Sequence, residues 1–360
     1  MADHKRIGIL TSGGDCAGLN AVIRAVVNRA VRAYGWEVLG IHQATHGLMV
    51  DPPEALPLSI RRVESILTHG GTMLGTTNKG NPFAFPMADG SLRDRSEEII
   101  AGYRKLGLDA MIGIGGDGSL AILRKLAQQG GLNLVGIPKT IDNDVGLTER
   151  AIGFDTAVNT ATEALDRLHF TAASHSRVMI LEVMGRDAGH IAISAGIAGG
   201  ADIILIPEIA YDIERVCAKI HDREEHGKNY SLVIVAEAVK SAGNQVMTQT
   251  DGLGECRLGG IGQHLSEQIC KHTGAETRVT VLGHVQRGGV PSPLDRLIGT
   301  AFGVAAVDLI AEEKYDQMVT WQQREVRSVP LEDAIRHYAA VNPLGTLVKT
   351  ARGMGICLGD

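Results

Sequence analysis

Two short stretches of the sequence combine residue types that can transfer a phosphoryl group. Residues 113–119 read GIGGDGS, a glycine-rich run that contains the carboxylate of Asp117. A carboxylate in such a loop repels phosphate unless a cation bridges the two, so we expect the loop to hold a metal-nucleotide. Residues 138–144 read PKTIDND, and Thr140, Asp142 and Asp144 alternate there with other residues. If this stretch is extended, a hydroxyl and two carboxylates share one side of the chain. A metal carboxylate, a phosphate loop and a candidate base indicate phosphoryl transfer to an alcohol.

A second glycine-rich loop, residues 12–18 (SGGDCAG), joins a predicted strand to a predicted helix. The N–H groups of a helix N-terminus favour anions, so this loop is either a phosphate site or a tight turn that needs glycine. It lacks the terminal lysine and hydroxyl of a Walker A loop and is not one. Cys16 lies in the loop, where a helix N-terminus can make a thiol reactive; the favoured alternative is a small buried side chain.

Basic residues gather at the ends of predicted strands. His175 and Arg177 precede one strand, which ends in EVMGR with Arg186; Arg278 opens another, which ends in GHVQRGG with His284 and Arg287. Each residue alone is more typical of a surface ion pair. Together, and near a nucleotide loop, they are what a phosphorylated substrate with two anionic groups requires. Glu237 ends a further strand and is a candidate for binding sugar hydroxyls or, equally, for a salt bridge.

Short apolar segments alternate with helical patterns along the chain. The predicted strands are residues 7–10, 38–41, 110–115, 134–137, 178–183, 203–206, 231–237 and 278–282, and the predicted helices are 19–34, 120–128 and 157–168. This alternation indicates a doubly wound α/β protein with mostly parallel sheets. Ligands bind such folds at the carboxyl ends of strands, where the loops described above fall. The polar segment 240–260 is expected to form a surface excursion.

Composition excludes several classes of function. The chain has 360 residues, 44% of them hydrophobic, which is enough for two globular domains. A net charge of −6 without a Lys/Arg-rich run argues against nucleic acid as the main partner. The five cysteines include no CxxC pair, so neither a disulfide framework nor a zinc site is expected. No signal peptide or apolar run of membrane length is present, so we expect a cytoplasmic protein without membrane partners.

The GIGGDG run also matches the dinucleotide fingerprint GxGxxG. A dehydrogenase on a Rossmann fold is therefore an alternative. The match is weak, because Asp117 would face an uncompensated pyrophosphate and the KTIDND segment would have no role.

The motifs SGGD, GGDGS, KTIDND, HSR, EVMGR, an isolated glutamate and TRVTVLGHVQRGG stand in the order found in the 6-phosphofructokinase family, which this chain resembles from about residue 7 to residue 289. The resemblance implies two doubly wound α/β domains with mostly parallel sheets and an active site in the cleft between them. The first would comprise residues 1–153 and about 286–336 and bind the phosphoryl donor. The second would comprise residues 154–285 and about 337–360 and bind the sugar phosphate.

The resemblance also assigns a role to each motif residue. Asp142, Thr140 and Arg186 would be catalytic, with Asp142 as the base that takes the proton of the fructose 1-hydroxyl and Asp144 in support. Asp117 would hold Mg²⁺. The donor would be bound by Gly13, Lys79, Gly80, Asp117, Gly118 and Ser119. Fructose 6-phosphate would be bound by Thr140, Asp142, Arg177, Met184, Gly185, Arg186, Glu237, Arg278, His284 and Arg287. Arg177 and Arg278 would come from a neighbouring subunit, so a homo-oligomer, specifically a tetramer, is implied.

Two positions decide the expected donor. Lys139 replaces the glycine of the short bacterial enzymes and is typical of the pyrophosphate-using and mixed-donor branches. Gly118 is the choice of ATP-using relatives, because pyrophosphate-dependent ones usually carry aspartate there. We weigh Gly118 above Lys139 and expect ATP.

The sequence therefore predicts an Mg²⁺-dependent enzyme that phosphorylates fructose 6-phosphate with ATP. Three alternatives stay open: the same reaction with pyrophosphate or ADP, an inactive regulatory or binding paralogue, and the NAD-binding dehydrogenase. An inactive paralogue is disfavoured because Asp117, Asp142, Arg186, His284 and Arg287 are all present.

Overall fold

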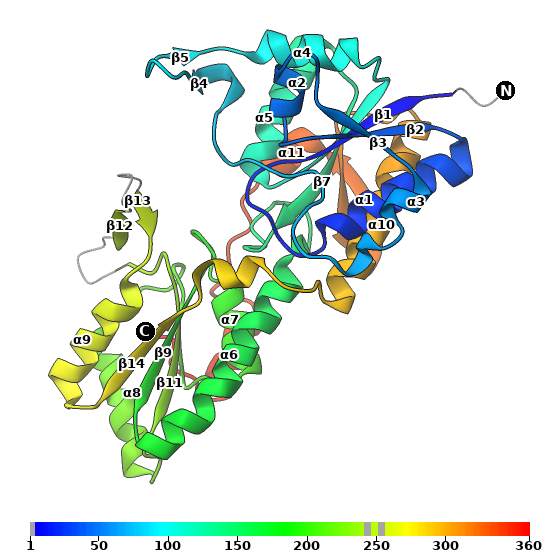
Figure 1. The fold of residues 1–360 in the computed structure, drawn as a ribbon. Helices are drawn as coiled ribbons and strands as arrows, with labels where there is room; N and C mark the ends of the chain where they lie inside the picture. The colour runs from blue at the N-terminus through cyan, green and yellow to red at the C-terminus, as the bar shows by residue number, and fades with distance from the viewer. Residues whose placement is uncertain (1–3, 241–245, 251–255) are drawn as a thin grey trace. The chain divides into compact units, whose positions relative to one another are not determined.

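The computed structural model describes residues 4–240, 246–250 and 256–360. Within them the chain forms two compact units (Figure 1). The first unit comprises Met1–Thr140, Asp144–Asp155 and Arg287–Tyr338, and the second comprises Ile141–Asn143, Thr156–Gln286 and Ala339–Asp360. Each unit is therefore assembled from stretches that are distant in sequence.

The first unit is built on a mainly parallel sheet. Its strands are β1 (Arg6–Thr11), β2 (Glu37–Ile41), β3 (Ala55–Leu58), β6 (Ala110–Gly115), β7 (Leu134–Thr140), β8 (Ile152–Gly153), β15 (Gln317–Gln322) and β16 (Glu325–Pro330). They lie in the order β16-β15-β7-β6-β1-β2-β3, with β8 paired to the end of β7. Only the outer strands β3 and β16 run antiparallel to their neighbours. A separate hairpin joins β4 (Phe85–Pro86) to β5 (Leu92–Arg93).

Helices cover both faces of this sheet. They are α1 (Leu19–Arg29), which continues as the π-helix η1 (Ala30–Tyr34), α2 (His46–Met49), α3 (Ile60–Val63), α4 (Ser96–Lys105), α5 (Asp117–Gly130), α10 (Pro293–Ala311) and α11 (Leu331–Arg336), with short 3₁₀ turns η2 (Ile66–Thr68) and η3 (Pro82–Ala84). Helix α1 packs against α10, and α5 packs against α4 and α11. Leu120, Leu123 and Leu126 of α5 are fully buried at helical spacing, which fixes the face that α5 turns to the sheet.

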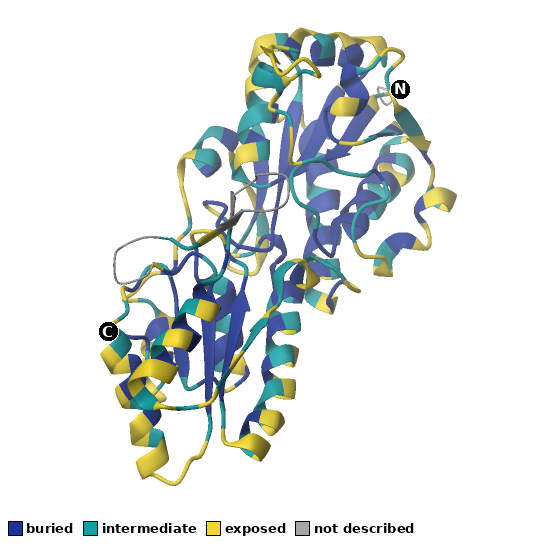
Figure 2. Ribbon diagram, turned by 60° about the vertical axis from the view of Figure 1, so that its left-hand side comes forward, coloured by how far each residue is buried: buried dark blue, intermediate teal, exposed yellow. Residues whose placement is uncertain are grey.

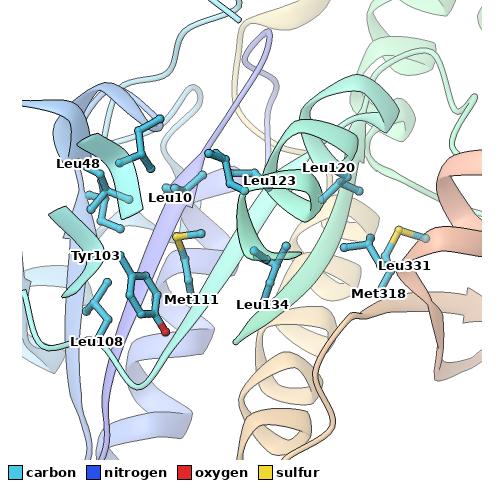
Figure 3. Packing of buried hydrophobic residues seen from close by; sticks show 14 of the residues in the cluster. Leu10, Leu48, Tyr103, Leu108, Met111, Leu120, Leu123, Leu134, Met318 and Leu331 are labelled. Atoms are coloured by element: carbon cyan, nitrogen blue, oxygen red, sulfur yellow. The ribbon is translucent and has the colours of Figure 1, made fainter. Parts of the chain in front are cut away.

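A hydrophobic core cluster of the first unit lies between the sheet and α5. Figure 3 shows Leu10 and Met111 from the strands against Leu123 of α5, with Tyr103 of α4 closing one side. Met318 and Leu331, from the C-terminal part of the chain, complete the cluster. The sheet and its helices are therefore tied together by residues from both ends of the chain.

The second unit has a parallel sheet of strands β9 (Val178–Val183), β10 (Ile203–Leu205), β11 (Ser231–Ala236) and β14 (Thr277–Val281), in the order β10-β11-β9-β14. Its helices are α6 (Phe154–His175), α7 (His190–Ala198), α8 (Ile213–Glu225), α9 (Ile261–Thr273), α12 (Thr346–Gly353) and the 3₁₀ turn η4 (Gly283–Arg287). Strands β9 and β11 are buried along their whole length, as Figure 2 shows, because helices cover them on both faces. The predicted class, α/β with mostly parallel sheets, is confirmed.

Two local expectations from the sequence are wrong. The GGDGS run is not a free loop, because α5 already begins at Asp117. Strand β7 does not stop at Pro138 but continues to Thr140. Pro138 has no N–H to donate, but β7 accommodates it. On the side of β15 and β8, Pro138 lies between Val135 and Gly136, which pair with β15, and the stretch that pairs with β8.

Residues 140–144 do not form the extended stretch that was considered for them. The chain is not extended there, because it bends after Thr140 and Asn143 has a φ of 54°. Thr140, Asp142 and Asp144 therefore do not line one side of a strand.

The predicted excursion at residues 240–260 falls partly outside the described residues. The described parts form an antiparallel hairpin of β12 (Thr248–Thr250) and β13 (Cys256–Leu258). In the part of the chain that the structure describes, none of the helices has the length and apolar character needed to cross a membrane.

Candidate active site

The loop of residues 12–18 leaves the carboxyl end of β1 and leads into α1. Gly13 has a φ of 84°, and its N–H donates to the carbonyl of Thr77 at 2.9 Å. A Cβ on Gly13 would lie 2.9 Å from Ser119 Oγ and 3.3 Å from Lys139 Nζ. Gly13 is thus required for a left-handed backbone and for close packing, and its own N–H is already used within the unit.

The predicted metal carboxylate Asp117 lies in the first turn of α5, with Gly118 and Ser119. The N–H groups of a first helical turn have no acceptor within the helix, which makes this turn suited to phosphate. Ser12 Oγ donates to Ser119 Oγ at 3.2 Å, so the loop after β1 and the start of α5 meet. A Cβ on Gly118 would have no atom within 4 Å, so the space beside it is open.

Lys139 is held inside the first unit. Its side chain is 4% exposed, and Nζ donates to the carbonyl oxygen of Gly14. Through this hydrogen bond the Lys139 ammonium holds the loop of residues 12–18 in place.

A pocket of about 310 Å³ opens beside two predicted donor-binding residues, Lys79 and Gly80. Its other lining residues are Gln43, Thr45, His46, Met49, Thr77, Phe85 and Pro86. Apolar surfaces of Met49, Phe85 and Pro86 combine there with polar groups, as in a site for a flat heterocycle. The sequence analysis missed this pocket, because its walls come from segments without a recognisable motif.

Asp142 and Thr140 are both buried, at 3% and 9% exposure. Thr140 ends β7 in the first unit, whereas Asp142 belongs by its contacts to the second. Asp144 is 3% exposed.

In the second unit, the loops after β9, β11 and β14 emerge side by side. Val183 of β9 pairs with Ala236 of β11, and Glu182 of β9 pairs with Val281 of β14. The residues that follow the three strands, namely Met184, Gly185, Arg186, Glu237 and His284, therefore lie at one edge of the sheet, as the sequence predicted for parallel strands.

Glu237 holds the turn that follows β9. Its Oε1 accepts hydrogen bonds from the N–H groups of Gly185, at 3.3 Å, and Arg186, at 3.1 Å. Burial raises the pKa of Glu237 to about 7; the nearby carboxylates of Asp142 and Glu182 add to the rise, and the two N–H groups oppose it. Among the residues that the structure describes, Glu237 forms no salt bridge; it anchors the backbone of this turn and titrates near neutral pH.

Gln286 is a residue that the sequence analysis missed. It is 1% exposed and its Oε1 accepts from Met184 N–H at 2.8 Å. Only the position of Gln286 between His284 and Arg287 could have drawn attention to it.

Arg287 is the first residue of the C-terminal stretch of the first unit and contacts the loop of residues 12–18 within that unit. Its Nη1 donates to the carbonyl of Asp15 at 3.2 Å and lies 2.8 Å from where a Cβ on Gly14 would be. The guanidinium thus lies against the loop of residues 12–18.

Arg177 and Arg278 lie at the other edge of the second sheet. Both pair with Glu276, Arg177 at 3.0 Å, and these arginines lower the pKa of that carboxyl. Arg177 precedes β9 and Arg278 is the second residue of β14. At about 3.3 Å per residue, the length of β9 puts roughly 17 Å between this edge and the Met184–Arg186 turn. Within their own unit these arginines do not reach the turn.

Cys16 is a buried, inert thiol. It is fully buried, Sγ donates to the carbonyl of Ile152 at 3.3 Å, and burial raises the thiol pKa to about 12. The interpretation as a small buried side chain is confirmed, and the reactive alternative is wrong.

The chain is similar to known proteins along its whole length. The model of the family described as phosphofructokinase matches residues 6–310. The ATP-dependent 6-phosphofructokinase 1 proteins of Synechocystis sp. and Nostoc sp. are each 69% identical over 360 residues and all of both chains.

Solved structures share the fold. Pichia pastoris phosphofructokinase in the T-state is 32% identical with a TM-score of 0.80, over 92% of this chain and 38% of that longer chain. The pyrophosphate-dependent phosphofructokinase of Nitrosospira multiformis has a TM-score of 0.82 at 21% identity, over 99% of this chain and 93% of the other. The family match and the full-length relatives lead to one conclusion: this chain belongs to the phosphofructokinase family.

Proposed function

We propose that this phosphofructokinase transfers the terminal phosphoryl group of ATP to the 1-hydroxyl of fructose 6-phosphate, giving fructose 1,6-bisphosphate and ADP, the committed step of glycolysis. The observation that carries the proposal is the 69% identity, along the whole chain, to a protein named ATP-dependent 6-phosphofructokinase 1. We assign donor binding to the first unit and sugar-phosphate binding to the second, and we place the enzyme in the cytoplasm.

The choice of ATP rests on two features of the first unit. The open space beside Gly118 leaves room for an α-phosphate next to the first turn of α5. The pocket beside Lys79 and Gly80 offers apolar walls to a base and ribose. Pyrophosphate has neither a base nor a ribose, so this pocket would be without use for a pyrophosphate donor.

Mg²⁺ is the metal that we assign to Asp117; kinases generally need a divalent metal. Among the described residues no group of three or more His, Cys, Asp or Glu side chains could hold a metal by itself. This fits Mg²⁺, which takes one or two protein carboxylates and completes its shell with waters and the phosphate oxygens of its nucleotide. When bound, the ion would neutralise charge on the donor phosphates.

The chemical step is assigned to three residues. Asp142 takes the proton of the sugar 1-hydroxyl while that oxygen bonds to the terminal phosphorus, and the bond from phosphorus to the ADP oxygen breaks. Thr140 orients the acceptor beside the base. Arg186 places its positive charge on the transferring group, where negative charge lies in the transition state.

The sugar phosphate is assigned to the edge of the second sheet, with Met184, Gly185 and Glu237 at the sugar and His284 and Arg287 at the 6-phosphate. Arg177 and Arg278 lie at the opposite edge of that sheet. We therefore assign them to the pocket of a neighbouring subunit in a homo-oligomer, specifically a tetramer.

The test is a coupled aldolase assay on fructose 6-phosphate with ATP, ADP and pyrophosphate supplied separately. Turnover with ATP is expected. If the enzyme turned over with pyrophosphate or ADP and not with ATP, that compound would be the donor in place of ATP. No turnover with any donor would favour an inactive paralogue, and NAD binding without sugar-phosphate binding would favour a dehydrogenase.

A further inference from the structure

The turn after β9 has an unusual backbone, which one backbone hydrogen bond closes, from the Ala188 N–H to the carbonyl of Gly185 at 3.0 Å. Gly185 has a φ of 150° and Arg186 a φ of 48°, which is uncommon for a residue with a side chain. A Cβ on Gly185 would lie 2.5 Å from the carbonyl oxygen of Ala188. Such a conformation persists only where surrounding groups fix it.

Side chains from the two neighbouring strands fix this turn. Glu237, after β11, accepts from the N–H groups of Gly185 and Arg186. Gln286, in η4 after β14, accepts from the N–H of Met184 at 2.8 Å. Three successive amides of the turn are thus held by one carboxylate and one carboxamide.

Gln286 is itself well anchored. It is 1% exposed, and η4 follows directly on Leu282, whose N–H donates to the carbonyl of Glu182 in β9 at 3.1 Å. Among the described residues nothing pairs with Gln286 Nε2, which is buried. An unpaired buried N–H is unfavourable, so the residue contributes through its oxygen and not through its nitrogen.

We propose that Gln286 is a positioning residue for the transfer, holding the Met184–Arg186 turn in place relative to the segment that carries His284 and Arg287. This inference rests on the proposed function. Arg186 contacts the transferring group, and the flanking His284 and Arg287 hold the sugar 6-phosphate. One carboxamide then sets the spacing between the two anionic groups of the substrate. Misplacement by about 1 Å far from the reacting atoms can reduce turnover by about 10²-fold.

The test compares two variants that each remove one part-buried side-chain hydrogen bond in the second unit. Gln286→Met keeps the size and removes both the acceptor and the unpaired N–H, so the melting temperature should change little. Ser266→Ala is the matched control, because Ser266 Oγ lies 2.6 Å from Thr277 Oγ1, at the start of β14 and not at its end.

We expect Gln286→Met to lower kcat by about 10- to 100-fold with the KM for ATP within about twofold of wild type. Peptides covering residues 183–188 should exchange amide hydrogen for deuterium faster than in wild type. Ser266→Ala should change neither. Gln286→Glu retains an acceptor of equal reach and should recover most of the lost turnover.

Wild-type turnover in Gln286→Met, or an equal loss in Ser266→Ala, would overturn the proposal. If Gln286→Met does not fold, the Gln286→Glu variant decides. Hydrogen exchange at residues 183–188 as slow as in wild type supports the positioning role, and faster exchange contradicts it. Hydrogen exchange is read without substrate. An enzyme that uses no donor on fructose 6-phosphate would therefore refute the proposed function while this measurement still reports on the contact.

Discussion

The loop before α1 and the turn after β9 are both held by hydrogen bonds, but of different kinds. In the first unit, Gly13 N–H and Lys139 Nζ donate to backbone carbonyl oxygens, which do not titrate. In the second unit, the turn depends on the side chains of Glu237 and Gln286, and the pKa of Glu237 is about 7. The difference indicates that the loop before α1 is held through acceptors that do not titrate, whereas the turn after β9 depends on a carboxylate that titrates near pH 7.

The largest effect is expected at Asp142, the proposed base, which belongs by its contacts to the second unit. Asp142→Asn is nearly isosteric and should lower kcat by at least about 10²–10⁴-fold, because the amide cannot accept the hydroxyl proton. The KM for fructose 6-phosphate should change only a few-fold. Steady-state kinetics on folded protein decide this, and near-wild-type turnover would remove Asp142 from the role.

A change in the first unit, to which we assign donor binding, should affect the use of the donor alone. A side chain at Gly118 meets no protein atom, so Gly118→Asp should fold normally. Its carboxylate would oppose an α-phosphate by about 4 kcal/mol at 4 Å and an effective dielectric near 20, before screening, which is enough to abolish ATP use. The measurement is ATP turnover together with the melting temperature.

Lys139→Gly is the companion variant. It should leave much of the ATP use but lower the melting temperature, because Gly14 loses its buried donor. Wild-type protein that uses pyrophosphate and not ATP would show that Lys139, and not Gly118, decides the donor.

A mixing experiment extends the comparison to a second copy of the chain. If Arg278 acts in a neighbour's site, Asp142→Asn and Arg278→Ala subunits should complement each other after co-expression. Random pairing of the two in a symmetric dimeric contact restores about a quarter of the sites. Activity assays with sedimentation at the same concentration test this; a fully active monomer would contradict it.

The smallest effect is on stability and follows from Glu237. Its folded pKa of about 7 exceeds the ordinary 4.5, so between these values the folded state binds more protons than the unfolded state. Stability should therefore fall as pH rises from about 4.5 to 7 and then level off. At about 1.4 kcal/mol per pH unit the change is at most about 3 kcal/mol, and less after solvent screening. The melting temperatures of wild type and Glu237→Gln, measured from pH 5 to 8, should converge at the acidic end. A constant difference between them across this range would refute the raised pKa of Glu237.

The sequence predicted the strands and the loops at their carboxyl ends, because short apolar runs and glycines are local signals. It did not predict the role of Glu237 as an anchor or the presence of Gln286, because their partners are amides of a turn distant in sequence. The bend at Asn143 was also missed, since a positive φ in a residue other than glycine has no reliable pattern. Local chemistry was readable, and the contacts that position it were not.

The discontinuous first unit has a consequence for synthesis on the ribosome. Strand β15 pairs with β7, and Met318 and Leu331 complete the core around Met111 and Leu123. The ribosome must therefore synthesise nearly all of the second unit before the first unit can complete its sheet. Contacts this distant in sequence form slowly, and the open edge of β7 stays exposed until they do. A stalled or truncated chain should consequently depend on chaperones, and neither unit should be obtainable by expressing one continuous stretch of the gene.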